Sequence, residues 1–263
     1  MSHHVALDGI RVERAGPVAT IWLDRPAKRN AMSYAMWAGL GAACTELGED
    51  ASVRVVVLRG AGGNFCAGAD IGELLAERPA GAPPFHQVNM ACEQALANMP
   101  KPTVAYVEGD CIGGGCALAI DCDLRIAVDG ARFGITPAKL GVVYPAASHE
   151  RVGRLLGPAA AKLLLFTGRL VDTATALRIG LVSEVHDVGA GEAALDALCA
   201  ELAGRSLLSQ AASKEMLAAV AATGGVPAQL EQHWAEVAAK SGDLREGVAA
   251  FAERRPPQFT WPG

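Results

Sequence analysis

The chain has 263 residues, of which 51% are hydrophobic and 19% are charged. The composition excludes an intrinsically disordered chain. The length is sufficient for one domain with a substantial hydrophobic core. The formal net charge of −5 argues against general nucleic-acid binding, because that activity needs a basic surface.

The seven cysteines are scattered, without the spacing of a zinc site or of a disulfide framework. The histidines are dispersed as well, so no metal site is expected. We therefore expect reduced thiols and a cytoplasmic protein. Residues 1–4 show no basic region followed by an apolar core, which argues against a secretory signal. No apolar run of about 18 residues predicts a membrane span.

Strands and helices are predicted to alternate up to about residue 135. Apolar, β-branched runs indicate strands, and a capping residue before a helical spacing of apolar residues indicates a helix. The predicted elements are, in chain order, a strand over 18–23, a helix over 33–47 capped by Ser33, a strand over 53–59, a loop over 79–84 leading into a helix that ends before Pro100, and a strand over 103–107.

The chain is predicted to be mostly helical after Pro158. Asp172 and Thr173 offer caps for a short helix that ends near Gly180. The last sixty or so residues predict three helices, with breaks at 224–227 and 241–242.

Two glycine-rich turns, at residues 65–71 and 109–116, each follow an apolar strand and lead towards a helix. The first N–H groups of a helix have no intrahelical partner, and the helix dipole adds positive potential there. Two such ends facing one another could hold a negative oxygen between backbone donors. An oxyanion hole of this kind stabilises an enolate or a tetrahedral intermediate, typically by ~3 kcal/mol per donor.

Other glycine motifs fit less well. In a dinucleotide fingerprint starting at Gly60, the third glycine would fall at Phe65. A phosphate loop would need Lys and then Ser or Thr where Gly115 and Cys116 stand. The remaining alternative is that these glycines only allow close packing of strand and helix.

These turns and several other ordered motifs resemble the crotonase, or enoyl-CoA hydratase/isomerase, superfamily, over nearly the whole chain. The matching segments are 23–32, 65–71, 109–127, 168–185 and 245–259. The resemblance implies an α/β fold, the crotonase-like (ClpP/crotonase) spiral of ββα units. It places this core and the active site in residues 1–200 and a helical oligomerisation region in residues 201–263. It also implies a homotrimer, often paired as a hexamer.

The resemblance further implies that the oxyanion donors are the backbone N–H groups of Ala69 and Gly114. The substrate would be an acyl thioester of coenzyme A, with no permanently bound cofactor. The residues that the resemblance places near the substrate are Lys28, Arg29, Ala67, Gly68, Phe251 and Arg254. A neighbouring subunit would contribute the last two, which could equally belong to a solvated helix face. Asp70 is expected to have a structural role at the start of the next helix.

Two departures from the family pattern concern catalysis. Hydratases of this family use two glutamates to place water across the double bond, and the corresponding positions here hold Ala117 and Pro137. Neither residue can carry a proton, and general acid–base catalysis needs titratable groups within reach of the substrate or water. We therefore expect no ordinary hydration.

The segment 136–144 resembles that of methylmalonyl-CoA decarboxylase-like members, with Thr136 before a proline and Tyr144 eight residues later. Decarboxylation needs a stabilised enolate but no strong base at carbon, so the oxyanion hole and these two hydroxyls could suffice. Alternatively, Thr136 caps a turn and Tyr144 is a half-buried aromatic residue.

Other side chains could supply a proton. Asp121 lies four residues after Ala117, on the same face if the helix continues. Glu150, next to His149, lies near the start of a predicted helix after Pro145. The alternatives are a capping or ion-paired Asp121 and a solvated or subunit-contact pair at 149–150.

Cys66 and Cys116 flank the oxyanion donors. A nucleophilic cysteine needs a base partner, and the family forms no such intermediate, so we expect two packing residues.

The sequence favours an acyl-CoA enzyme that is a non-hydratase lyase, such as a decarboxylase. One alternative is a hydratase or isomerase with relocated acids. Another is a non-catalytic acyl-CoA-binding protein, which a pocket without any titratable group would favour.

Overall fold

The computed structural model describes residues 5–76 and 80–263. The expectations about residues 1–4 and about Pro79, at the start of the predicted loop, lie outside the described residues.

Seven strands form one mixed sheet in the order β1-β2-β3-β4-β5-β7-β9. The strand β2 pairs antiparallel with β1 on one side and with β3 on the other, and the remaining pairs of this sheet are parallel. The bounds are β1 Val5–Leu7, β2 Ile10–Ala15, β3 Val18–Leu23, β4 Val55–Gly60, β5 Thr103–Val107, β7 Leu124–Val128 and β9 Glu184–His186. A separate parallel pair is formed by β6 Asp110–Ile112 and β8 Arg132–Gly134.

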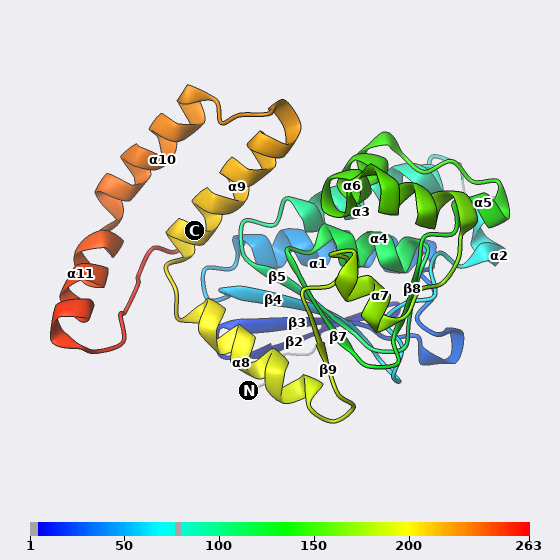
Figure 1. The fold of residues 1–263 in the computed structure, drawn as a ribbon, viewed down its shortest axis with the longest axis horizontal. Coiled ribbons are helices and arrows are strands. Elements are labelled where there is room, and N and C mark those ends of the chain that lie inside the picture. The colour runs from blue at the N-terminus through cyan, green and yellow to red at the C-terminus, as the bar shows by residue number, and fades with distance from the viewer. Residues whose placement is uncertain (1–4, 77–79) are drawn as a thin grey trace.

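Helices cover both faces of the sheet (Figure 1). One face carries α1 Tyr34–Glu49, α3 Phe85–Ala97 and α4 Gly114–Asp121, and the other carries α8 Gly191–Ala203. Side chains of β4 alternate between the two cores: Val56 and Leu58 pack with the first group of helices, and Val55 and Val57 pack with α8. This burial on both faces explains why β4 reads as a continuous apolar run.

The remaining helical segments that precede α8 in the chain surround the carboxyl ends of the parallel strands or connect the layers. They are the 3-10 turn η1 Pro26–Lys28, α2 Ile71–Leu74, α5 Pro137–Leu140, α6 Ala146–Thr167 and α7 Thr173–Arg178.

Local sequence signals set several boundaries where they were predicted. The Ser33 side chain caps α1 by accepting from the Met36 amide, and Asp172 caps α7 by accepting from the Thr175 amide. The strands β3 and β5 have the predicted bounds. The helix α6 begins directly after Pro145, as predicted, and continues past Pro158 with a kink at Gly157, where φ is +70°. Proline removes one helical N–H, and the preceding glycine absorbs the distortion.

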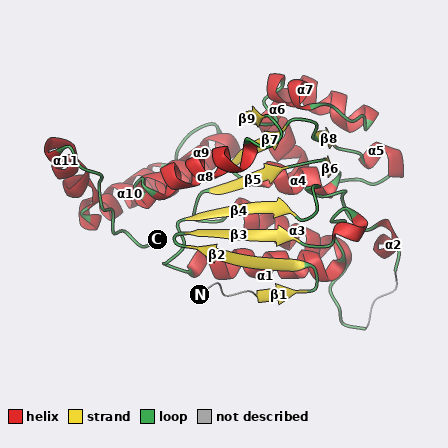
Figure 2. Ribbon diagram, turned by 90° about the horizontal axis from the view of Figure 1, so that it is seen from below, coloured by secondary structure: helices red, strands yellow, loops and turns green. Residues whose placement is uncertain are grey.

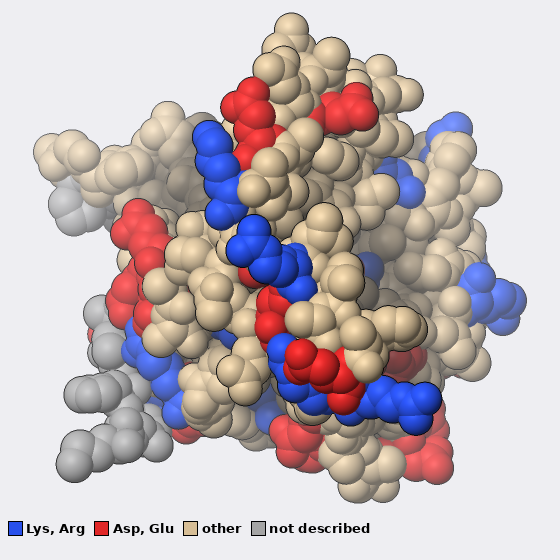
Figure 3. Space-filling view, turned by 90° about the vertical axis from the view of Figure 1, so that its left-hand side faces the viewer, with Lys and Arg blue, Asp and Glu red and all other residues tan. Residues whose placement is uncertain are grey.

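The C-terminal helices are α9 Leu207–Thr223, α10 Ala228–Ser241 and α11 Asp243–Glu253, with breaks near 224–227 and at Gly242, as predicted. They extend away from the sheet in two perpendicular views (Figures 1 and 2). On the face that carries them, acidic and basic side chains are interspersed (Figure 3).

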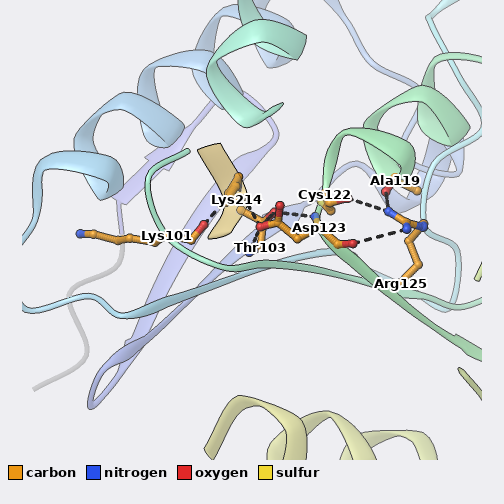
Figure 4. A network of polar contacts seen from close by, with 7 residues as sticks. All are labelled: Lys101, Thr103, Ala119, Cys122, Asp123, Arg125 and Lys214. Carbon is orange, nitrogen blue, oxygen red and sulfur yellow. Dashed lines mark hydrogen bonds and ion pairs between the residues drawn. The ribbon is translucent and has the colours of Figure 1, made fainter. Parts of the chain in front are cut away.

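A polar network ties α9 to the core (Figure 4). Lys214 Nζ lies 2.8 Å from Asp123 Oδ2, which also accepts from the Thr103 amide and hydroxyl. Arg125, two residues further along, donates to main-chain carbonyls that include Cys122 at 2.6 Å. These contacts fix the end of α4 and the start of β7.

Within the described residues, no helix is both long and apolar enough to cross a bilayer.

Candidate active site

Two turns lie side by side beyond the carboxyl ends of β4 and β5. The Cys66 amide donates to the Asp110 carbonyl at 2.8 Å, and the Ile112 amide donates to the Cys66 carbonyl at 2.9 Å. The Gly113 amide is held by the Gly134 carbonyl of β8 at 2.8 Å. These bonds join the two glycine-rich turns through their main chains, so their relative position depends little on side chains.

Among the described residues, the main-chain hydrogen bonds of the first turn involve the residues on either side of Ala69 but not the Ala69 amide. The Met32 amide donates to the Gly68 carbonyl at 2.8 Å, and the Asp70 amide donates to the Met32 carbonyl at 2.9 Å. Across residues 5–76 and 80–263, the structure gives no backbone hydrogen bond donated by Ala69 or Gly114.

The Ala69 and Gly114 amides lie close to one another. A Cβ atom built on Gly68 would stand 3.6 Å from the Gly114 nitrogen, and one built on Gly114 would stand 3.5 Å from the Ala69 nitrogen. Gly68 has φ of +105° and Gly113 has φ of +59°, which residues with side chains rarely adopt. Two neighbouring amides of this kind can donate to one developing oxyanion.

Two hydroxyls border the second turn. From the position that a Cβ atom on Gly113 would take, the Thr136 Oγ1 atom lies 3.5 Å away and the Tyr144 hydroxyl oxygen lies 3.6 Å away. Thr136 is the N-cap residue of α5, but its side chain makes no capping hydrogen bond. The Tyr144 side chain is half-buried, and burial is the main cause that raises the pKa of its hydroxyl. The two side chains therefore place polar oxygens beside the candidate oxyanion hole.

The two positions of the family glutamates are apolar here. Ala117 is 7% exposed and lines a small cavity of about 10 Å³, whereas Pro137 is buried at the start of α5. The side chains that line this cavity are Ala117, Ile120, Asp121, Ile135, Tyr144, Ser148, Arg151 and Val152. A position that could have held one acid thus borders a cavity with four polar side chains.

Arg151 joins two buried carboxylates beside this cavity. Its Nη1 atom lies 3.0 Å from Asp121 Oδ1 and 3.3 Å from Glu93 Oε2. Glu93 also accepts from the Ser148 hydroxyl at 2.9 Å and from the Asn89 side-chain amide at 3.2 Å. Asp121 Oδ2, by contrast, is buried and has no hydrogen-bond partner within the described part of the chain.

This environment favours the protonated form of Asp121. Burial is the main cause that raises the pKa of its carboxyl well above the ordinary value of 3.8, and the negative charge of Glu93 adds to the shift. Arg151 and Arg125 oppose it. Asp121 thus contacts Arg151 and also lines the same cavity as Ala117.

Sequence reasoning missed Glu93, Ser148 and Arg151. Glu93 could have been found, because it falls on the apolar stripe of α3 together with Cys92 and Leu96. A carboxylate on a buried helix face needs a polar partner. The partner, Arg151, comes from α6, and no local pattern identifies it.

Glu150 does not join this cluster. Its side chain is 60% exposed and lies 3.4 Å from Arg154, one turn along α6. The neighbouring His149 is also exposed, and its Nδ1 atom lies 3.1 Å from the Pro145 carbonyl. The side chains of α6 that line the cavity are instead Ser148, Arg151 and Val152.

Arg29 and Lys28 lie on the turn next to the first loop. The Arg29 carbonyl accepts from the Ala67 amide at 2.9 Å, and its guanidinium lies 2.9 Å from the buried Asp110 carboxylate. Arg132, which the sequence reading did not single out, binds the other oxygen of Asp110 at 2.6 Å. Lys28 is exposed. The turn and the start of β8 therefore present three cations near the first loop, and the Asp110 carboxylate partly neutralises them.

Phe251 and Arg254 belong to the end of α11 and are exposed, with Phe251 at 87%. In space, their helix lies on the opposite side of the structure from α5 (Figure 1). Within one chain these two residues are not brought to the loops, so their assignment to the substrate stays a prediction that requires a neighbouring subunit.

Other side chains near the loops are structural. Asp70 caps α2 and lies 2.7 Å from the Arg25 guanidinium. Cys66 and Cys116 are fully buried, and burial raises the pKa of the Cys66 thiol to about 12. Within the described ranges, no group of three His, Cys, Asp or Glu side chains could hold a metal ion.

Comparison with known proteins identifies the family of this chain. The family model described as enoyl-CoA hydratase/isomerase matches residues 13–262. A crotonyl-CoA hydratase from Syntrophomonas wolfei is 31% identical, and the alignment covers 97% of this chain and 99% of the relative. The bovine mitochondrial enoyl-CoA hydratase domain-containing protein 2 is 36% identical, with coverage of 93% and 86%.

Solved structures give the same result. The crystal structure of an enoyl-CoA hydratase/carnithine racemase from Magnetospirillum magneticum superposes with a TM-score of 0.88 at 34% identity, over 97% of this chain and 96% of that one. The chain therefore belongs to the enoyl-CoA hydratase/isomerase family, whose members act on thioesters of coenzyme A. The predicted crotonase-like α/β fold is confirmed.

Proposed function

We propose that this chain is an acyl-CoA enzyme that stabilises a thioester enolate between the Ala69 and Gly114 amides and cleaves a carbon–carbon bond. The observation that carries the proposal is the pair of neighbouring amides with the Thr136 and Tyr144 hydroxyls beside them, while Ala117 and Pro137 occupy the glutamate positions. Family membership supports coenzyme A thioesters as the substrate class.

The specific reaction we propose is decarboxylation of a malonyl-type thioester. The bond between the α-carbon and the carboxylate breaks, carbon dioxide leaves, and the electron pair moves onto the thioester oxygen as an enolate. The two amides stabilise that charge where it develops. A proton from the Tyr144 hydroxyl then forms the new C–H bond at the α-carbon, so one proton is consumed per carbon dioxide released.

A hydratase or isomerase with a relocated acid is the second candidate. It is supported by the names of the relatives and by Asp121, a buried carboxyl that lines the same cavity as Ala117. Hydration needs a base that activates water and an acid that protonates carbon. Asp121 is favoured in its protonated form, which suits the acid but not the base. This imbalance makes decarboxylation the better candidate.

A protein that only binds acyl-CoA is less well supported. A site that only binds acyl-CoA would gain nothing from a buried carboxyl and a guanidinium beside the thioester, because burial of such groups costs desolvation energy. The cavity beside the candidate hole is lined by Asp121, Tyr144 and Arg151, which favours catalysis.

The region 201–263 is proposed to assemble the chain into a homotrimer or hexamer. Supporting it, apolar side chains that are 43–87% exposed lie along α9 and α11: Leu217, Val220, Leu244, Val248 and Phe251. Exposed apolar surface of this extent is typical of subunit contacts. Light scattering on the purified protein should give a trimer or hexamer mass, and a monomer would contradict the proposal.

The substrate proposal is tested by offering purified protein methylmalonyl-CoA, malonyl-CoA and crotonyl-CoA in parallel. Release of carbon dioxide from one of the first two, with little hydration of the third, supports a decarboxylase. Hydration of crotonyl-CoA as the only reaction supports the second candidate, and tight binding without turnover supports a binding protein.

A further inference from the structure

The cavity beside Ala117 has the size of a site for a single water molecule. Its volume of about 10 Å³ is close to the smallest space that holds one water. Asp121, Tyr144, Ser148 and Arg151 all line it and provide polar groups. Asp121 and Tyr144 thus border one space that is about large enough for a single water molecule.

The charges around the cavity do not balance if every group is ionised. Arg151 supplies one positive charge to two carboxylates, Asp121 and Glu93, whose side chains are only 2% and 6% exposed. Two neighbouring buried carboxylates that share one cation are stabilised when one of them keeps its proton.

The hydrogen bonds indicate which carboxyl keeps it. Glu93 has three polar partners, Arg151, Ser148 and Asn89, which all donate to its carboxyl oxygens. Asp121 has Arg151 on Oδ1 and no partner on Oδ2. A proton on Oδ2 would therefore compete with no donor of the described residues at that atom.

We infer that Asp121 carries a proton at this cavity and passes it, through a water molecule held there, to the Tyr144 hydroxyl. This inference rests on the proposed function, in which Tyr144 protonates the enolate. Asp121 is then a proton reservoir, and Arg151 and Glu93 are positioning residues that hold it.

The proton transfers balance. The Tyr144 O–H bond breaks as its proton goes to the α-carbon of the enolate. The cavity water gives a proton to the Tyr144 oxygen and takes the proton of Asp121. Asp121 is left as a carboxylate paired with Arg151 and regains its proton from solvent before the next turnover, which supplies the one proton consumed per cycle.

Several elements present titratable or charged groups to Asp121. They are Cys44 from α1, Glu93 and Cys92 from α3, Arg125 from β7, Tyr144 before α6 and Arg151 from α6. Of these, the two arginines favour the ionised carboxyl and Glu93 opposes it.

A spectroscopic experiment tests the inference without relying on turnover. Infrared difference spectra of the wild-type protein and of Asp121→Asn should differ by one carbonyl stretch of a protonated carboxylic acid at neutral pH. The matched control is Asp196→Asn, which removes an exposed carboxylate of α8 and should leave that band in place. A wild-type spectrum without the band at neutral pH would overturn the inference, even if the protein decarboxylates its substrate.

Kinetics tests the link to Tyr144. With the best malonyl-type substrate, Asp121→Asn should lower kcat by about 100-fold and leave KM nearly unchanged. The double variant with Tyr144→Phe should be no slower than the slower single variant, because both residues act in one relay. Independent, multiplying effects would contradict the relay. If no thioester is decarboxylated by the wild type while the infrared band is present, the proposed reaction fails and the protonated Asp121 stands.

Discussion

Asp121 lies one helical turn after Ala117 on α4, and the two side chains line the same small cavity. The family's first glutamate position is thus apolar, and an acid stands one turn further from the start of the helix. There, the Arg151 guanidinium contacts the Asp121 carboxyl, and Tyr144 lines the same cavity. On our proposal, the displaced acid no longer positions water against a double bond but supplies a proton to the tyrosine.

Replacing Gly114 by proline should remove one oxyanion donor. Gly114 is the first residue of α4, where proline is well tolerated in a helix. We expect turnover of the best substrate to fall by about 10²- to 10³-fold, with a smaller loss of coenzyme A affinity. Gly114→Ala is the matched control, because it adds the Cβ atom, 3.1 Å from the Trp37 ring, but keeps the N–H. Turnover of the proline variant equal to that of the wild type would show that this amide is not a donor.

Restoring one glutamate should not create a hydratase. We expect Ala117→Glu to leave crotonyl-CoA hydration at least about 100-fold below that of a hydratase with two working acids. Pro137 still occupies the second position and lacks both an acid and an N–H. The assay is the loss of the enoyl absorbance, with circular dichroism to check folding. Efficient hydration by this single variant would mean that Asp121 or another residue already serves as the second acid.

Removing the Tyr144 hydroxyl separates a catalytic tyrosine from a packing one. If the hydroxyl protonates the enolate, Tyr144→Phe should lower kcat by about 100-fold or more, with the fold and coenzyme A affinity nearly intact. If it only packs, the loss of one oxygen should change stability by about 1 kcal/mol or less and should barely affect turnover. Equal rates at matched concentration would remove Tyr144 from the mechanism and favour a binding protein.

The raised pKa of Asp121 gives a pH dependence of stability. The folded protein binds this proton more tightly than the unfolded chain, so the wild type loses stability as the pH rises above the ordinary value of 3.8. Asp121→Asn does not undergo this loss. We therefore expect the variant to gain stability relative to the wild type as the pH rises from 4 to 7, as measured by urea unfolding. A difference that is constant with pH would indicate an unshifted carboxyl.

Much of the fold follows from local sequence. Ser33 and Asp172 are residue types that commonly cap helix N-termini, so both helix starts could be predicted. The apolar run of β4 requires cover on both faces of the sheet. The assignment of Ala69 and Gly114 as main-chain donors comes from the family resemblance, and the positive φ angles of Gly68 and Gly113 are compatible with it. Their actual use in catalysis remains a proposal.

The acid cluster could be predicted only in part. The spacing of Ala117 and Asp121 placed the latter on the correct face of α4, but its partners come from elements far along the chain. Arg151 and Glu93 meet only because α3 and α6 both pack beside α4. Glu150 was the more visible acid of α6, yet the phase of that helix turns Arg151 inward and Glu150 to solvent.

The most direct test of the account is a competition between two reactions in the wild-type protein. Equal concentrations of methylmalonyl-CoA and crotonyl-CoA are incubated with the enzyme, and the acyl products and carbon dioxide are quantified together. The account predicts conversion of methylmalonyl-CoA to propionyl-CoA and carbon dioxide, with hydration at least about 100-fold slower. Rapid formation of 3-hydroxybutyryl-CoA with no carbon dioxide would contradict it.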